Sequence, residues 1–326
     1  MSISPYITSS IVVQLLAFAI PSLERLSKEG GEEGRKQINQ YTRYGAVILA
    51  AIEAFGIYAM YKNQGVFLSN GVLTPLLFVL SLTAGSTFLM WLAEQITTRG
   101  IGNGTSLLIF AGIVSGIPQA VSILYNLCVA EGIKGIIISI VVLIAAVILI
   151  AGVVWVTEAE RRVPVQYAKR VVGRKMYGGQ NTHIPLKLAM AGVMPVIFAS
   201  SFMTFPAMLI QMFNPNIMYQ TTGFWAGVYK FSVATSSAGV GIGYTIASAI
   251  VYLLLILGFT FFYTYATFNP AEVSNNIKKN GGFIPGIRAG KPTTDYLKAI
   301  ISKLTWFGGF FLALIAVIPI LIGITG

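Results

Sequence analysis

Charged side chains are scarce in this sequence of 326 residues, of which only 10% are Asp, Glu, Lys or Arg. A soluble domain carries about 25% charged residues, because its surface has to be solvated. The mean hydropathy of +0.76 points in the same direction. These values exclude a soluble globule of this size and indicate a membrane protein.

Residues that bind metals or act as nucleophiles are also few. Cys128 is the one cysteine, so no disulfide can form within the chain. His183 is the one histidine; no cluster with metal-ligand spacing surrounds it, and we interpret it as an ordinary surface residue. No P-loop is present, and neither Gly102-Asn103-Gly104 nor the serines near position 200 have a base nearby in the sequence. The sequence therefore predicts no catalytic residue, no metal, no cofactor and no enzymatic activity.

Long apolar runs make up most of the chain instead. Each approaches the roughly 20 residues that a helix needs to cross a bilayer. Backbone in lipid has to satisfy its own hydrogen bonds, and continuous runs do not fit the alternating pattern of a β-barrel, so we expect helices. The sequence predicts an all-α polytopic membrane protein, one transmembrane domain over residues 1–326. Its eight spans are expected at approximately 5–22, 45–61, 72–93, 106–125, 133–156, 188–213, 243–266 and 304–325.

Lysine and arginine are spread unevenly over the connections between these runs. Nineteen of the 22 lie in alternate connections, which are residues 23–44, 94–105, 157–187 and 267–303. The other connections hold only Lys62, Lys134 and Lys230. Because Lys and Arg accumulate in short cytoplasmic loops, we expect the rich connections inside and Met1 outside. The start of the chain has no basic region and no cleavage site, so the spans themselves are expected to direct insertion.

Two of these connections stand out by their net charge. Residues 157–187 hold seven cations and two acids, a net charge of +5, and residues 267–303 hold six and two, a net charge of +4. Both are expected to bind polyanions. Residues 23–44 hold five cations and four acids, and we interpret them as a solvated turn with paired charges.

The two strongly basic loops are also expected to contain local structure. Alternation of apolar and polar residues in 157–187 predicts a short hairpin that turns near Gly173. In the second loop we expect a short helix around 271–279, then a Gly/Pro-rich turn that carries Arg288, then a helix from Thr293 to Lys303.

Several residues inside the expected spans break the apolar pattern. Glu53 is the one acid deep in a span, which favours either an ion-coupling role or, as we prefer, a protonated or interior-facing carboxyl without a transport role. Glu94 lies at a helix end and is interpreted as structural. Helix-weakening residues interrupt the fourth and sixth spans, and they indicate either a water-lined cavity or close helix packing. They are Gly112, Gly116, Pro118, Gly192, Pro195 and Pro206.

Five blocks of sequence follow one another along the chain: SISPYITSSIVVQLL, KEGGEEGRKQINQYTRYG, WLAEQITTRGIGNGTSLLIFAGI, AERRVPVQYAKRVVGRKMYGGQNTHIPLKLAMAGVMPVIFASS and FNPAEVSNNIKKNGGFIPGIRAGKPTTDYL. In this order they closely resemble the SecY family, the channel subunits of the bacterial protein translocase. The resemblance covers most of residues 3–320. It implies a clamshell of helices around an hourglass pore, with a lateral opening toward lipid.

In that family a ring of aliphatic side chains forms the narrow waist of the pore. The matching positions here are Ile7, Ile11, Ile109, Ile113 and Ile197. Residues four apart lie on one helix face, which fits the two pairs in this set. An apolar constriction stops water and ions by dewetting, yet it can part around an extended polypeptide. Without the resemblance, these side chains would be interpreted as facing lipid or neighbouring helices.

The resemblance also implies a lateral gate and docking surfaces. The gate of the family lies between the helices that match the first and sixth spans, which makes Thr8, Ser9 and Ser10 candidates for a polar seam; hydrogen bonds between helices without a gating role are the alternative. The family's basic loops receive the ribosome or the SecA motor, whose phosphates or carboxylates pair with Lys and Arg. The matching positions are Arg162, Lys169, Arg174, Lys175 and Arg288.

The resemblance further implies partners and a location. We expect SecE and SecG-like small membrane subunits, SecA, the ribosome, signal peptides, nascent polypeptides and lipid, in the bacterial plasma membrane. The family has ten spans, and the first span, the plug and the tenth span have no counterpart in these 326 residues. A secondary transporter that uses Glu53 and a non-conducting docking scaffold are the alternatives to a channel that passes unfolded polypeptide and releases apolar segments into lipid.

Overall fold

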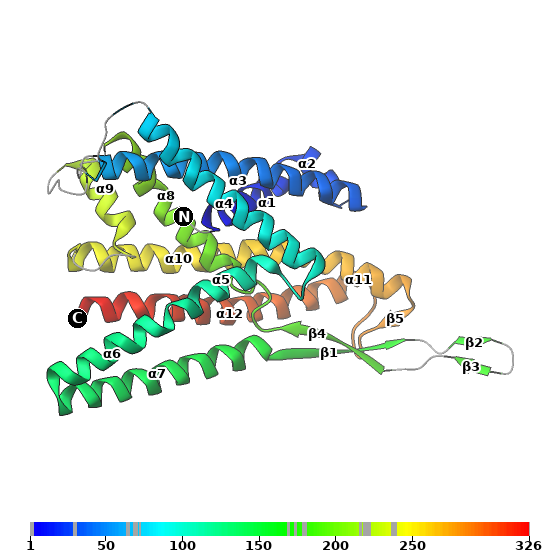
Figure 1. Cartoon of the computed structure of the whole chain (residues 1–326). Helices are drawn as coiled ribbons and strands as arrows, with labels where there is room; N and C mark the ends of the chain where they lie inside the picture. Colours follow the sequence, from blue (N-terminus) through cyan, green and yellow to red (C-terminus); the bar gives the residue numbers. More distant parts are fainter. Residues whose placement is uncertain are drawn as a thin grey trace. The chain divides into compact units, whose positions relative to one another are not determined.

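A computed structural model describes most of the chain. The described residues are 3–28, 31–62, 66–67, 71, 73–167, 170–172, 175–177, 181–214, 217, 223–235 and 240–325. Contacts divide the chain into two compact units, whose elements are labelled in Figure 1. The first unit comprises Met1–Leu143 and Ser201–Val233, and the second comprises Ile144–Ser200 and Ala234–Gly326.

The regular elements of the first unit, within its described residues, are all helices. Its helices are α1 (Ser4–Ala19), α2 (Pro21–Lys28), α3 (Gly31–Lys62), α4 (Leu73–Arg99), α5 (Gly104–Ser115), α6 (Ile117–Glu131), the start of α7 (Ile133–Glu158), the end of α8 (Met194–Phe213) and α9 (Phe224–Val233). Helix α1 begins with Pro5 in its first turn and ends just before Pro21. Proline is tolerated at a helix start but cannot continue a helix, which explains both boundaries. Helix α3 packs on both α1 and α4.

The connection between the first two expected spans, residues 23–44, is the clearest departure from the prediction. Residues 23–44 were expected to form a solvated turn, but residues 23–28 belong to α2 and residues 31–44 to the first turns of α3, so this prediction is wrong. Glu32 and Glu33 lie in the first turn of α3, where the helix dipole favours negative charge. Glu32 also precedes Lys36 by four residues, a spacing that stabilises an exposed helix.

Of the residues expected to interrupt the fourth and sixth spans, Gly116 and Gly192 lie at breaks, whereas Gly112 and Pro206 lie inside helices. The fourth span consists of α5 and α6, which meet at Gly116, whose N–H donates to the carbonyl of Ile113 at 3.1 Å. The sixth span starts at Met194 instead of residue 188, because residues 188–193 form turns and Gly192 has a φ of +56°. Pro206 lies inside α8.

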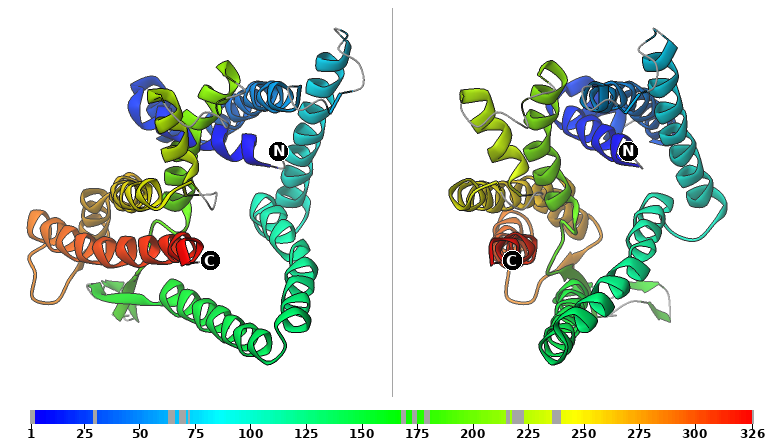
Figure 2. Two further views of the ribbon diagram at one scale, coloured as in Figure 1. Left: turned by 90° about the vertical axis from the view of Figure 1, so that its left-hand side faces the viewer. Right: turned by 60° about the vertical axis from the view of Figure 1, so that its left-hand side comes forward.

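The second unit combines helices with a small sheet. It contains the rest of α7, β1 (Glu160–Tyr167), β2 (Arg170–Val172), β3 (Lys175–Tyr177), β4 (Asn181–Lys187), the start of α8, α10 (Ile242–Thr267), α11 (Pro270–Lys279), β5 (Gly282–Phe283) and α12 (Lys291–Thr325). Helices α10 and α12 lie side by side (Figures 1 and 2). Gly309 permits this approach, because a Cβ there would lie 3.2 Å from Leu257 and 3.3 Å from Thr260.

The sheet joins the two strongly basic loops. Its strand order is β4-β1-β5, and Val163 lies opposite Ile184 while Gln166 lies opposite Phe283. The predicted hairpin in 157–187 is therefore confirmed. It continues into β2 and β3, which pair through Val172 and Lys175 at the far end of the ribbon (Figure 1). The expected turn residue Gly173 lies outside the described residues.

One apolar core supports both loops. The buried residues of this core come from β1 and β4, from α11, from the position after β5 and from the first turns of α12: Val163, Val165, Leu186, Ile277, Ile284, Leu297, Ile300 and Leu304. The short helix expected at 271–279 is confirmed as α11, and the helix expected from Thr293 begins two residues earlier, at Lys291. The two loops therefore form one folded surface, which their separation in the sequence did not reveal.

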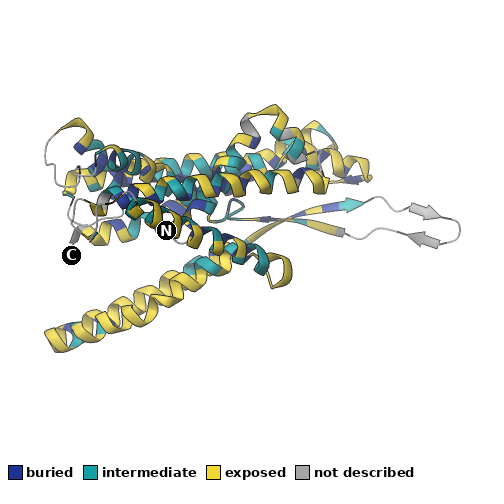
Figure 3. Cartoon of the chain, turned by 45° about the horizontal axis from the view of Figure 1, so that its top comes forward, coloured by how far each residue is buried: buried dark blue, intermediate teal, exposed yellow. Residues whose placement is uncertain are grey.

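Helices long and apolar enough to cross a membrane account for most of the expected spans. Within the described residues there are six: Leu73–Arg99, Gly104–Glu131, Ile133–Glu158, Met194–Phe213, Ile242–Lys279 and Lys291–Gly323. The first expected span corresponds to a shorter apolar helix, Ser4–Ala17, and the second to the C-terminal part of α3. Helix α7 is exposed along most of its length (Figure 3), as expected for a helix that faces lipid or partner helices.

Candidate pore lining and docking loops

The isoleucines that match the family's pore waist lie on three helices. On α1, Ile11 is only 5% exposed and Ile7 is half-buried. On α5, Ile109 is half-buried and Ile113 is 68% exposed, two residues before the helix ends. Ile197 is half-buried on α8 and belongs to the second unit. The ring of all five stays a prediction.

The hydroxyl of Ser9 connects α1 to α3. Its Oγ donates a hydrogen bond of 2.7 Å to the carbonyl oxygen of Thr42, and the side chain is buried. A Cβ at Gly45 would overlap this Oγ, so a larger residue there would displace the Ser9 hydroxyl. Thr8 and Ser10 are half-buried, and Ser10 accepts a bond from the Gln14 amide at 3.4 Å. The role of these three residues in a gate stays a prediction, but Ser9 already anchors α1 to its neighbour.

The candidate docking residues lie on the sheet and on the loop before α12. Arg162 extends from β1 and is exposed, and its Nε donates to Glu160 Oε1 at 2.7 Å. Lys175 begins β3, and Arg288 is exposed. Lys169 and Arg174 lie outside the described residues. An exposed ion pair is worth little energetically, so Glu160 orients the Arg162 side chain without removing its charge from the surface.

Two buried hydroxyls form hydrogen bonds to the loop that carries Arg288, and neither was predicted from the sequence. Ser274 on α11 donates to the carbonyl of Gly290 at 3.0 Å, and Thr293 on α12 donates to the carbonyl of Arg288 at 2.9 Å. Both side chains are at most 2% exposed. Gly290 has a φ of +104°, a conformation that favours glycine. The signal in the sequence is weak: a small polar residue on each helix that flanks a glycine-rich turn.

Two contacts between helices involve polar residues outside these sites. Arg43 Nε donates to Glu94 Oε1 at 2.7 Å and joins α3 to α4, which agrees with the structural interpretation of Glu94. The Cys128 thiol lies 3.3 Å from Ser139 Oγ, between α6 and α7. His183 is exposed on β4.

Glu53, the acid on which a transporter interpretation depends, is half-buried on α3. An ion-coupled transporter needs a solute site that this carboxyl can reach. Among the described residues no group of three or more His, Cys, Asp or Glu side chains could hold a metal ion.

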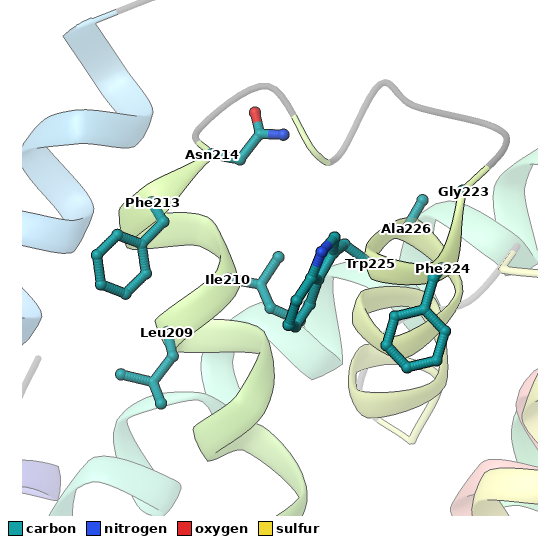
Figure 4. Close-up of a pocket in the computed structure, with 8 residues that line it drawn as sticks. All are labelled: Leu209, Ile210, Phe213, Asn214, Gly223, Phe224, Trp225 and Ala226. Carbon is teal, nitrogen blue, oxygen red and sulfur yellow. The ribbon is translucent and has the colours of Figure 1, made fainter.

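An apolar pocket of about 520 Å³ lies between the end of α8 and the start of α9. Ile210 and Trp225 approach each other between the two helices (Figure 4). Among the described residues that line it, Asn214 and the indole N–H of Trp225 supply the polar groups, and none is charged. This lining is predominantly apolar and suits hydrocarbon.

Comparisons with known proteins assign the chain to a family. The family model described as SecY matches residues 1–326. The protein translocase subunit SecY of Halalkalibacterium halodurans is 43% identical over 327 residues, which are 98% of this chain and 73% of the relative. The chain belongs to the SecY family.

Solved structures show the same fold. A SecY protein whose plug domain is described as stabilising the closed state of the translocation channel superposes with a TM-score of 0.68 at 21% identity, over 97% of this chain and 75% of the other. Sec61 from a canine ribosome–channel complex gives a TM-score of 0.60 at 20% identity, over 98% and 79%. The predicted SecY-like helical fold is confirmed.

Proposed function

We propose that the chain is the pore-forming subunit of a protein-conducting channel. It passes unfolded polypeptide across the membrane and releases apolar segments sideways into lipid. The match of the SecY family along residues 1–326 carries this proposal. The channel performs no covalent chemistry of its own and selects its substrates by partitioning. A segment of about 20 apolar residues gains free energy on entering lipid, whereas central charges each cost about 2.5–3.5 kcal/mol.

The basic sheet surface is the proposed docking site for the ribosome or for SecA. Support comes from the shared core of both loops, from the exposed Arg162 and Arg288, and from a structural relative that was solved in a ribosome–channel complex. SecE and SecG-like subunits are the expected membrane partners. The bacterial plasma membrane is the proposed location, with the charged loops inside and the first residues of the chain outside.

Ion conductance of the reconstituted protein tests the pore. Ile11, Ile109 and Ile113 are replaced together by glycine, and conductance is recorded in planar bilayers alongside the original chain. Widening an apolar waist lets water wet it, so we expect a marked rise in ion leakage. The matched control replaces three exposed isoleucines of α7, Ile137, Ile144 and Ile148, by glycine, and it leaves the leak unchanged. Equal conductance in the waist variant and the original chain would count against this pore.

Labelling of intact cells tests the orientation separately. A cysteine at Arg288, in a chain whose Cys128 is replaced by Ala, is exposed to a membrane-impermeant maleimide. We expect reaction only after the membrane is permeabilised. Reaction in intact cells would place the docking surface on the external side, and the proposed function would fail.

A further inference from the structure

A groove lies between the membrane end of β1 and the first turns of α12, apart from the docking residues. Its volume is about 310 Å³. The lining combines two cations and a phenol with three apolar side chains: Arg161, Lys303, Tyr296, Ala299, Ile300 and Leu304. On α12 these residues recur at spacings of three and four, so they share one face of the helix.

Arg161 is directed toward this groove by the alternation of β1. It lies on the same face of the strand as Val163 and Val165, which are buried against α12 residues in the core, and it is paired across the sheet with the buried Leu186. Glu160 and Arg162 occupy the opposite face, where they bond to each other. None of the lining residues is acidic, so the groove presents two positive charges without an internal counterion.

Exposed tryptophans mark the depth of this groove in the membrane. Trp155, at the end of α7, is 78% exposed, and Trp306 on α12 is 57% exposed. Tryptophan gathers at the boundary between lipid and water. Lys303 precedes Trp306 by three residues, a rise of about 4.5 Å, and Arg161 follows the end of α7 by three residues. Both cations therefore lie at the level of lipid phosphates on the charged, cytoplasmic side.

We propose that this groove binds the phosphate of an anionic phospholipid from the cytoplasmic leaflet. Arg161 and Lys303 contact the phosphate, the Tyr296 hydroxyl donates a hydrogen bond to it, and the first methylenes of an acyl chain lie against Ile300 and Leu304. The mixed lining favours a lipid over a soluble ligand, because inorganic phosphate or an acidic peptide would leave the apolar half of the groove in water.

Native mass spectrometry of the full chain in non-ionic detergent tests this site. The protein is titrated with dioleoylphosphatidylglycerol and, separately, with dioleoylphosphatidylcholine. We expect tighter binding of the first lipid, and a loss of about fivefold in that preference in Arg161→Gln and again in Lys303→Gln, which corresponds to about 1 kcal/mol per cation. The matched control is Lys298→Gln, which removes an exposed charge from the same helix outside the groove and leaves the preference unchanged.

Each alternative has its own outcome. Equal binding of the two lipids by the original chain overturns the proposal. The proposal also fails if Lys298→Gln lowers the preference for the anionic lipid as much as Arg161→Gln does, because the lipid would then be attracted by net charge and not by the groove. Displacement of the lipid, mole for mole, by inorganic phosphate or by a glutamate-rich peptide would assign the groove to a soluble ligand. The pair Arg161→Lys and Lys303→Arg keeps both charges and is expected to keep the preference, which separates loss of charge from damage to the fold.

Discussion

The contact between Ser9 and Gly45 provides the sharpest test of how α1 is held. Replacing Gly45 by Ala brings a methyl group into overlap with the Ser9 Oγ, which donates to the Thr42 carbonyl at 2.7 Å. The hydroxyl has to leave, and the interhelical bond is lost. If Ser9 is first replaced by Ala, the obstructing oxygen is gone, and the nearest remaining atom is the Ser9 Cβ at 3.6 Å, an ordinary contact distance.

The structure predicts that the effect of Gly45→Ala changes sign between the two backgrounds. Hydrogen bonds between membrane helices are worth about 0.6 kcal/mol on average, and overpacking costs about 1–3 kcal/mol. A glycine-to-alanine change inside a helix, by itself, raises the free energy of unfolding by about 1 kcal/mol. Gly45→Ala alone should therefore lower the free energy of unfolding by about 1–2 kcal/mol. In the Ser9→Ala background, it should raise that free energy by about 0.5–1 kcal/mol.

Reversible unfolding of the purified chain in mixed micelles, titrated with dodecyl sulfate, measures all four variants of this cycle. A coupling energy of about 2 kcal/mol is expected between the two positions. Equal costs of Gly45→Ala in both backgrounds would show that the α1–α3 contact is not as described. A Ser9→Ala variant with unchanged stability but altered lateral release of apolar segments would instead assign Ser9 to the gate.

Three further outcomes follow from the described contacts. Gly104→Ala should destabilise the chain by about 2 kcal/mol or more in the same unfolding assay, because its Cβ would overlap the backbone carbonyl of Ala93; a neutral result would contradict the close approach of α5 to α4. Ser274→Ala should weaken association with ribosomes or SecA without changing the net charge, because it frees the Gly290 carbonyl of the loop that carries Arg288; the exposed Ser122 on α6, replaced by Ala, is the control, and equal affinities in binding titrations would refute the role of Ser274. Glu53→Gln should leave polypeptide translocation intact, whereas loss of saturable uptake of a small solute would favour a transporter.

The apolar runs and the helix-breaking residues were sufficient to predict most of the helices of the fold. Runs of about 20 apolar residues located the spans because lipid leaves a backbone few alternatives to helix. Gly116 and Pro118 correctly placed the break between α5 and α6. The extension of α3 into the charged connection was missed, because charge alone does not distinguish an exposed helix from a solvated loop.

The site was less accessible to sequence reasoning, because it depends on contacts between distant segments. The pairing of Gln166 with Phe283, which joins the two basic loops, spans more than a hundred residues and leaves no local pattern. Ser274 and Thr293 resemble ordinary helix residues until Arg288 and Gly290 are placed beside them. The pore isoleucines were predicted only through the family resemblance, since an apolar residue that lines a pore cannot be distinguished in the sequence from one that faces lipid.

Photo-crosslinking of a translocating polypeptide measures the central claim most directly. A photoreactive amino acid replaces Ile109, Ile113 or Ile197, and a secretory polypeptide is arrested midway through the membrane. The account predicts adducts with the arrested chain from these positions and none from Ile144, an exposed residue of α7. Adducts from Ile144 alone, or from no position at all, would contradict a polypeptide path through these helices.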